Sequence, residues 1–229
     1  MKRMLFLIFI SSLFVLIGCN DEPSEKVLRY QENNEIIGPE KDEIIGDISD
    51  TIYDSIDRSN AKATEIFIHP VEAPGEQVIP PEGRYTIGPS MNADGSHTMQ
   101  SGRVVVYDED EALLIEEVLM DFGNVTVDLN GSHTVHVDGF TQAILTPVDT
   151  KMSNELYPGI WEVGKDIEAG NYSIHAEYGF GDLEIFEEGL PPRLFEILNT
   201  TPESMIDIQL KDGQKLKITG VGIQFEPQS

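Results

Sequence analysis

The stretch Glu82-Gly83-Arg84-Tyr85-Thr86-Ile87 has a counterpart later in the chain, Ala169-Gly170-Asn171-Tyr172-Ser173-Ile174. In both stretches a glycine precedes a β-type run that carries a tyrosine at the same place. A second pair follows, in which Gly102-Arg103-Val104-Val105-Val106-Tyr107-Asp108 matches Gly181-Asp182-Leu183-Glu184-Ile185-Phe186-Glu187. Similarity that recurs in the same order indicates a repeated structural unit. The chain is therefore predicted to contain two copies of one fold.

The ends of the two copies also correspond, with core-type and turn residues in the same order. Leu129, Val135, Val137, Gly139 and Pro147 align with Leu210, Leu216, Ile218, Gly220 and Pro227. Length differences between the copies fall between the predicted strands, where loops tolerate them. Each copy holds six or more short strands, so we expect an all-β protein with two tandem small β-sandwich or barrel-like domains, 63–148 and 154–228.

Turn residues set the expected hairpins. Asn130-Gly131 stands between two β-type runs and predicts a type I′ turn, which needs positive φ at both central residues. Asp212-Gly213 is expected to form the equivalent turn in the second copy. The segments 111–120 and 194–199 lie between strand pairs, and each fits either a short helix or a further strand.

Residues 19–62 are strongly acidic and nearly free of aromatic side chains, which is typical of a tether. Within them Ile45, Ile48, Ile52 and Ile56 fall three or four residues apart and predict a short amphipathic helix from about Asp42 to Arg58. This helix has two interpretations. It is either a docking segment, for a partner or for the chain's own β-domains, or a marginal helix in a mostly solvated spacer. Gly46 and the dense acidic residues favour the second.

The N-terminus has the order of parts of a secretion signal. Lys2 and Arg3 supply positive charge, and the apolar run 4–17 follows. A transmembrane helix needs about 20 apolar residues, whereas a signal peptide needs roughly 7–15. The run ends in Leu16-Ile17-Gly18-Cys19, which resembles the lipobox of bacterial lipoproteins.

This resemblance implies a signal peptide at 1–18, cleavage between Gly18 and Cys19, and diacylglycerol on the Cys19 thiol. It also implies a lipid-anchored protein on the extracytoplasmic face of the cell membrane, in an envelope of Gram-positive type. Cys19 is the single cysteine, so the exported part has no disulfides and depends on its hydrophobic core. An uncut signal anchor, or an ordinary signal peptide with a chance cysteine, is the alternative.

Charge limits the classes of partner. The chain holds 41 acidic and 15 basic residues, and removal of Lys2 and Arg3 with the signal leaves a formal charge of −28. Such a field repels nucleic acid and anionic lipid headgroups, so nucleic-acid binding is rejected. Divalent cations and cationic partners stay open, although solubility alone explains an acidic exported protein.

The second domain opens with Pro158-Gly159-Ile160-Trp161-Glu162-Val163-Gly164-Lys165-Asp166-Ile167-Glu168-Ala169-Gly170-Asn171-Tyr172. This segment resembles a G-x-W-x-V-G-x-D-I-x-x-G-x-Y signature of small extracellular β-repeats in Gram-positive secreted proteins and lipoproteins. In these positions glycines allow chain reversal, while Trp161, Val163, Ile167 and Tyr172 supply buried area. The resemblance implies a secreted β-module and brings no catalytic residue with it.

No pattern in the sequence predicts an enzyme, a metal site or a cofactor. His133 and His136 are expected on opposite faces of a strand, and the five histidines are interpreted as surface or edge residues, at positions 69, 97, 133, 136 and 175. The pairs Glu116 with Glu117 and Asp182 with Glu184 could serve a glycosidase, but in so acidic a chain such pairs arise by chance. The turns 108–111 and 128–131 offer oxygen ligands for calcium without EF-hand spacing.

Three functions are compatible with these features. The leading hypothesis is a membrane-anchored, non-catalytic binding or interaction module whose target is an envelope protein, a wall polymer or a secreted ligand. A surface protective or exclusion lipoprotein is the second. A hydrolase of wall polymers is the third, and it requires two converging carboxylates in a cleft.

Overall fold

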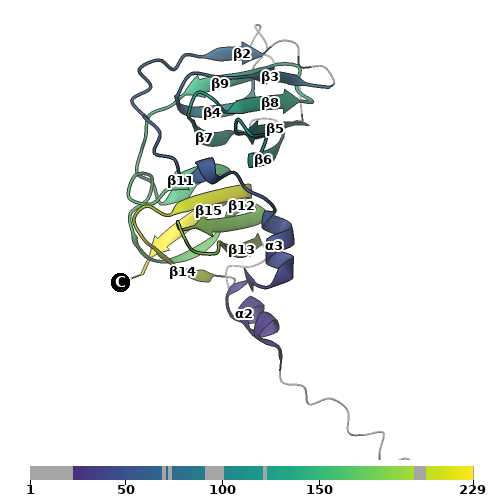
Figure 1. Ribbon diagram of the computed structural model, residues 1–229. Helices are drawn as coiled ribbons and strands as arrows, with labels where there is room; N and C mark the ends of the chain where they lie inside the picture. The colour runs from purple at the N-terminus through teal and green to yellow at the C-terminus, as the bar shows by residue number, and fades with distance from the viewer. Residues whose placement is uncertain are drawn as a thin grey trace, which may run out of the picture.

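The computed structural model describes residues 23–68, 71, 74–90, 101–120, 123–198 and 205–228. The predicted signal peptide 1–18, its cleavage site at Gly18 and Cys19, and the lipid attachment at Cys19 lie outside the described residues. Within them the strands form an eleven-stranded sheet and a four-stranded sheet, accompanied by two short α-helices. Figure 1 shows two β bodies stacked on each other, with the helices beside the lower one. The all-β fold class is confirmed.

The first β body draws strands from both sheets. The larger sheet contributes the order β7-β4-β9-β2, and the smaller sheet has the order β3-β8-β5-β6. The bounds are β2 (Ile66–Ile68), β3 (Glu76–Val78), β4 (Gly83–Pro89), β5 (Ser101–Tyr107), β6 (Leu113–Met120), β7 (Val125–Leu129), β8 (Thr134–Asp138) and β9 (Ala143–Pro147). Side chains alternate along a strand, so Val104 and Val106 of β5 share one buried cluster with Val125 and Val127 of β7.

The second β body is built on two long strands, β12 (Gly170–Phe186) and β15 (Lys215–Pro227). Their pairing shifts register twice, around Tyr178 and Gly179, and such irregularities bend strands. The start of β12 pairs with β14 and the end of β15, whereas its end pairs with β13 and the start of β15. The remaining strands are β10 (Glu155–Leu156), β11 (Gly159–Glu162), β13 (Arg193–Leu198) and β14 (Ile206–Leu210).

Strand pairing follows the same plan in both bodies. β4 lies between β7 and β9, as the start of β12 lies between β14 and the end of β15. β5 lies between β6 and β8, as the end of β12 lies between β13 and the start of β15. The registers agree as well, because Tyr85 is opposite Pro147 and Tyr172 is opposite Pro227.

The two aligned tyrosines make the same hydrogen bond. The Tyr85 hydroxyl donates to the carbonyl of Pro81 at 2.9 Å, four residues earlier in the chain. The Tyr172 hydroxyl donates to the carbonyl of Glu168 at 2.9 Å, with the same spacing. Both rings are buried, so each hydroxyl needs a partner, and each finds it in the turn that precedes its strand.

The predicted hairpin turns were wrong. β7 lies in the larger sheet and β8 in the smaller one, so Asn130-Gly131 carries the chain from one sheet to the other. Only Gly131 has positive φ, at 80°, and the Asn130 side chain accepts from the Ser132 and His133 amides instead. The Asp212-Gly213 turn likewise joins two strands that do not pair, β14 and β15. In both β bodies, the strands on either side of the short turn therefore pair with other strands and not with each other.

The segments 111–120 and 194–199, whose sequences fitted either a short helix or a strand, both form strands, β6 and β13. Glu116, Val118 and Met120 of β6 are exposed, while Glu117 and Leu119 between them are buried. This alternation has the period of two that a strand with one buried face requires. The competing helical interpretation is therefore excluded for both segments.

The predicted helix from about Asp42 to Arg58 was wrong. The chain instead forms α2 (Glu25–Asn33), β1 (Glu35–Ile36), α3 (Pro39–Ile45) and the 3₁₀ turn η2 (Asp50–Tyr53). α3 ends at Gly46, whose φ of 65° favours glycine. Ile45 and Ile52 are buried, and β1 pairs with β13 at the edge of the larger sheet. Of the two interpretations of this segment, docking on the chain's own β bodies is the one observed.

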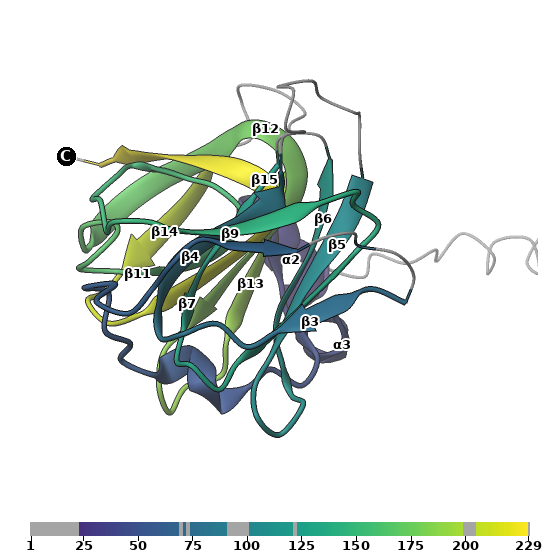
Figure 2. The same cartoon turned by 90° about the horizontal axis from the view of Figure 1, so that it is seen from above.

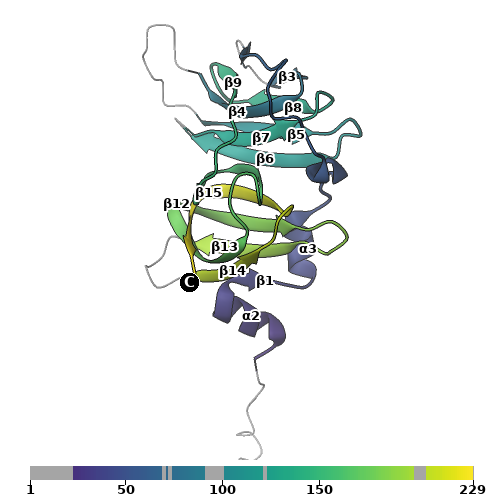
Figure 3. The ribbon, with the colours of Figure 1, turned by 90° about the vertical axis from the view of Figure 1, so that its left-hand side faces the viewer.

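A parallel contact joins the β bodies into one sheet. Gly159 of β11 lies opposite Thr126 of β7, and the Thr126 amide donates to the Pro158 carbonyl at 3.0 Å. A Cβ on Gly159 would lie 2.2 Å from the Thr126 carbonyl oxygen, so the backbones meet only because this residue is glycine. Figure 3 shows the two bodies from the side, with β6 and β7 in the upper one and β12 and β15 in the lower one.

Candidate functional site

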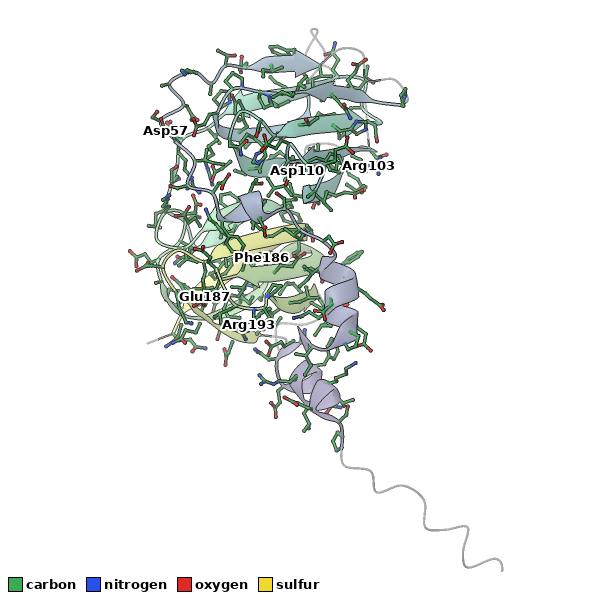
Figure 4. The ribbon with its side chains drawn as sticks, viewed as in Figure 1. Asp57, Arg103, Asp110, Phe186, Glu187 and Arg193 are labelled. Atoms are coloured by element: carbon green, nitrogen blue, oxygen red, sulfur yellow. The ribbon has the colours of Figure 1, made fainter. Side chains whose placement is uncertain are left out.

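A surface groove lies where the N-terminal segment crosses from the second β body to the first. It has a volume of about 300 Å³ and runs between the α3–η2 connection and the start of the β12–β13 loop. Its apolar lining consists of Ile45, Ile48, Ile52, Tyr53, Phe186 and Pro192. Phe186 is the last residue of β12, and Figure 4 shows it close to η2. We call this feature the N-terminal groove.

Acidic side chains surround the N-terminal groove. Asp47 and Asp50 are part of its lining, and both are exposed. Burial raises the pKa of the Tyr53 hydroxyl, and the nearby carboxylates of Asp50 and Glu188 raise that pKa further. The groove therefore combines an apolar floor with a negatively charged rim.

The floor of the groove is held in place by hydrogen bonds to the first body. The Ser49 amide donates to the Leu113 carbonyl at 2.8 Å, and the Thr51 amide donates to the Ser49 hydroxyl at 3.1 Å. Ile45, Ile52 and Phe186 belong to the same buried cluster as the core of the first body. The groove is thus preformed, which lowers the entropy cost of binding a ligand.

A polar chain of four side chains runs beside the groove, from His133 through Thr51 and Ser49 to Asp108. The His133 ring is fully buried; its Nδ1 accepts from the Asn130 amide at 3.3 Å, and its Nε2 lies 2.9 Å from the Thr51 hydroxyl. Nδ1 is an acceptor, so Nε2 carries the proton and donates it to Thr51. To activate the Thr51 hydroxyl as a nucleophile, His133 would have to accept its proton. Because His133 donates to that hydroxyl instead, these four side chains do not activate a nucleophile.

The pKa shifts of His133 and Asp108 agree with a structural role for these four side chains. Burial lowers the pKa of His133, which keeps the ring neutral. The hydroxyl of Ser49 lowers the pKa of Asp108, and the amides of Asp110 and Ala112 donate to the same carboxylate at 2.9 Å. The expected surface position of His133 was wrong, because Thr51 and Asn130 give the ring buried partners that strand periodicity cannot reveal.

A second cleft, of about 410 Å³, opens on the first body. Gln77, Tyr107, Asp108, Glu111 and Thr134 line it. Asp108 is the only carboxylate of this cleft with buried hydrogen bonds, and its oxygens are held by Ser49 and the 110–112 amides. The carboxylate is consequently occupied by its own loop and not directed at a ligand.

The junction between the bodies contains a buried network of charges. Arg84 of β4 binds Asp128 at 2.9 Å and Asp166 at 3.0 Å. Arg58 binds Asp166 at 3.0 Å and Asp128 through its other terminal nitrogen at 2.6 Å. The Arg84 guanidinium also lies 5.0 Å from the centre of the Trp161 ring. Two bases and two acids alternate across the junction, and Glu162 lies 3.8 Å from Arg58 as a third acid, so this network fastens the bodies together.

Glu117 forms a further polar contact between the bodies. Its side chain is directed from β6 toward β15, where the Gly220 amide donates to both carboxylate oxygens at 3.1 Å. Burial raises the pKa of Glu117 to about 7, although the Gly220 hydrogen bond opposes the shift. Only 5% of the residue is exposed. Glu117 therefore titrates near neutral pH at the contact between the two bodies.

Three of the four carboxylates considered for hydrolysis are engaged by other groups. Glu116 pairs with Arg103 at 3.2 Å on the outer face of β6, whereas its neighbour Glu117 faces inward. Glu184 forms a buried ion pair with Lys217 at 2.9 Å, two residues along the strand from Asp182. Asp128, considered for calcium, binds Arg58 and Arg84.

Of the other four histidines, two lie at the periphery and two lie outside the described residues. His136 lies 3.3 Å from Asp138, and His175 lies 3.8 Å from Glu226. His69 and His97 lie outside the described residues. Across the described ranges, no three His, Cys, Asp or Glu side chains gather as metal ligands would. The same ranges hold no helix long and apolar enough to cross a membrane.

Sequence reasoning missed the groove and the charge network. The groove is formed by the segment 45–53 and by Phe186, which lie far apart in the chain. The sequence does single out Asp166, because it occupies the D position of the G-x-W-x-V-G-x-D-I-x-x-G-x-Y signature. No local pattern identifies Arg84 as its ion-pair partner. Neither a protein-family model nor a curated protein matches the chain.

Proposed function

We propose that the protein is a lipoprotein, tethered through lipid on Cys19 to the extracytoplasmic face of the cell membrane, and that its folded part is a non-catalytic binding module. The observation that carries the anchoring is the stretch Leu16-Ile17-Gly18-Cys19 directly after a charged and an apolar segment. Two acyl chains give stable attachment where one chain gives only marginal binding.

The docked N-terminal segment refines this proposal. α2 begins at Glu25, six residues after Cys19, and six extended residues reach at most about 21 Å. Asn33 exchanges two hydrogen bonds with the backbone of Asp207, at 2.8 and 2.7 Å, and Glu35 binds Arg193 at 2.9 Å. The lipid would therefore hold the second β body close to the membrane, with the first body farther out.

The finer fold assignment is part of the same proposal. We interpret the two bodies as copies of one small β-sandwich-like unit, related by duplication. The matching strand partners support it, as do the equal registers and the tyrosine hydrogen bonds of Tyr85 and Tyr172. A duplicated module without a reactive constellation is typical of recognition, in which surface and not chemistry carries the function.

Anchoring is tested by feeding cells an alkyne fatty acid and comparing the wild type with Cys19→Ala. The wild type should incorporate the label and sediment with membranes, and the variant should do neither. Binding is tested separately, by recovering envelope components on the acylated protein in the presence of divalent cations. Recovery of no specific component would refute the binding role while leaving the anchor intact.

A further inference from the structure

We infer that the N-terminal groove binds a segment of a partner protein in which basic side chains flank an apolar one. This inference deepens the proposed binding function and rests on it. At this groove an apolar floor lies beside the carboxylates of Asp47 and Asp50.

The size of the groove fits a short piece of peptide. Its volume of about 300 Å³ is at the lower end of the range for ligand pockets, so it takes one or two side chains and not a whole domain. Ile45, Ile52 and Phe186 form its base, and each is buried in the chain's own core.

The charge of the rim selects the partner. Asp47 and Asp50 have no ion-pair partner among the described side chains, and Glu188 lies close enough to Tyr53 to raise the pKa of its hydroxyl. The bases that flank this segment in sequence are held elsewhere. Lys41 is held by the Pro192 carbonyl at 3.2 Å and by Asp42, and Arg58 is held by Asp128 and Asp166. An incoming lysine or arginine would therefore meet free carboxylates, with its aliphatic stem on the apolar floor.

Other occupants fit less well. A second copy of this chain would bring a formal charge of −26 against the same charge, and an anionic lipid surface would be repelled likewise. An uncharged apolar molecule would use the floor and leave the rim carboxylates without a counter-charge. Binding of an acidic apolar peptide, which represents the negatively charged occupants, is one of the outcomes of the test.

The experiment measures fluorescence anisotropy with the full-length acylated protein in non-ionic detergent. The probes are three labelled ten-residue peptides that alternate Lys with Leu, Glu with Leu, and Lys with Ser. The test variant is Asp47→Asn with Asp50→Asn. The matched control is Glu65→Gln with Glu76→Gln, which changes the net charge equally at exposed positions of β3 and the residue before β2. Figure 1 shows these strands at the far end of the first body.

The Lys-Leu peptide should bind the wild type, and the rim variant should weaken that binding at least about tenfold, which corresponds to roughly 1.4 kcal/mol. The control variant should change it less than twofold. Raising the salt to 0.5 M should weaken the wild type similarly, which tests the inference even if the rim variant folds poorly.

Equal weakening by both variants would reduce the effect to general charge and overturn the inference. Binding of the Glu-Leu peptide, or Lys-Ser binding as tight as Lys-Leu, would overturn it too, as would the absence of Lys-Leu binding. Fatty-acid labelling of Cys19 in the same preparation separates these results from a failure of the anchoring proposal.

Discussion

Replacing Glu117 by glutamine should remove a pH-dependent loss of stability. Glu117 is nearly fully buried between the bodies, and the Gly220 amide is its hydrogen-bond donor. Its pKa is raised from 4.5 to about 7, so the folded state holds the proton more tightly than the unfolded state does. The stabilisation is complete below the unfolded pKa and is lost as the pH rises through the folded one.

The size of this loss follows from the pKa shift. Each pKa unit corresponds to about 1.4 kcal/mol, so ionised Glu117 costs the fold about 3 kcal/mol at pH 8. Glutamine is neutral at every pH and retains an oxygen that accepts from Gly220. Glu117→Gln should therefore match the wild type near pH 4 and exceed its free energy of unfolding by up to about 3 kcal/mol at pH 8.

Urea unfolding followed by the fluorescence of Trp161, at several pH values between 4 and 8, measures this difference. Burial lowers the pKa of His133 and so favours stability at higher pH, but that contribution is common to both proteins and cancels. Parallel pH profiles for the wild type and Glu117→Gln would refute the assignment of a protonated carboxyl at the junction. A variant that is less stable at every pH would refute it as well.

Three further changes test the contacts that join the parts. Asp166→Asn should lower the free energy of unfolding by about 3–5 kcal/mol, since it leaves Arg58 and Arg84 with Asp128 and the more distant Glu162; a loss under about 1 kcal/mol in chemical denaturation would contradict this. Gly159→Ala should cost about 3 kcal/mol by driving a Cβ against Thr126, and an unchanged melting temperature would count against the observed strand contact. Asn33→Ala should cost about 1 kcal/mol and speed hydrogen exchange in α2 alone; exchange that spreads through β15 would be inconsistent with a peripheral clamp.

The strand core was predictable because its signal is local. The repeated glycine–tyrosine stretches and the aligned core residues predicted which positions are equivalent, and Tyr85 and Tyr172 do occupy equal registers. Alternation of side chains along a strand and the need for a turn before it act over a few residues, so sequence spacing records both. Figure 2 shows how the resulting strands lie when viewed from above.

The N-terminal segment was not predictable in the same way. Asn33 meets Asp207 and Glu35 meets Arg193, more than 150 residues away in each case, and no local pattern encodes such contacts. Isoleucines at helical spacing do not form a helix there because Gly46 ends α3 and the later isoleucines pack against the β bodies. The Asn130-Gly131 turn failed for a related reason, since residue types define a turn but not which strands pair beyond it.

Mass spectrometry of the N-terminal peptide, from protein purified out of membranes, tests the lipoprotein proposal most directly. A mature chain that begins at Cys19 and carries the mass of diacylglycerol on that residue is the predicted result. A chain that retains Gly18 and the residues before it, or one that begins elsewhere with an unmodified Cys19, would contradict the proposal.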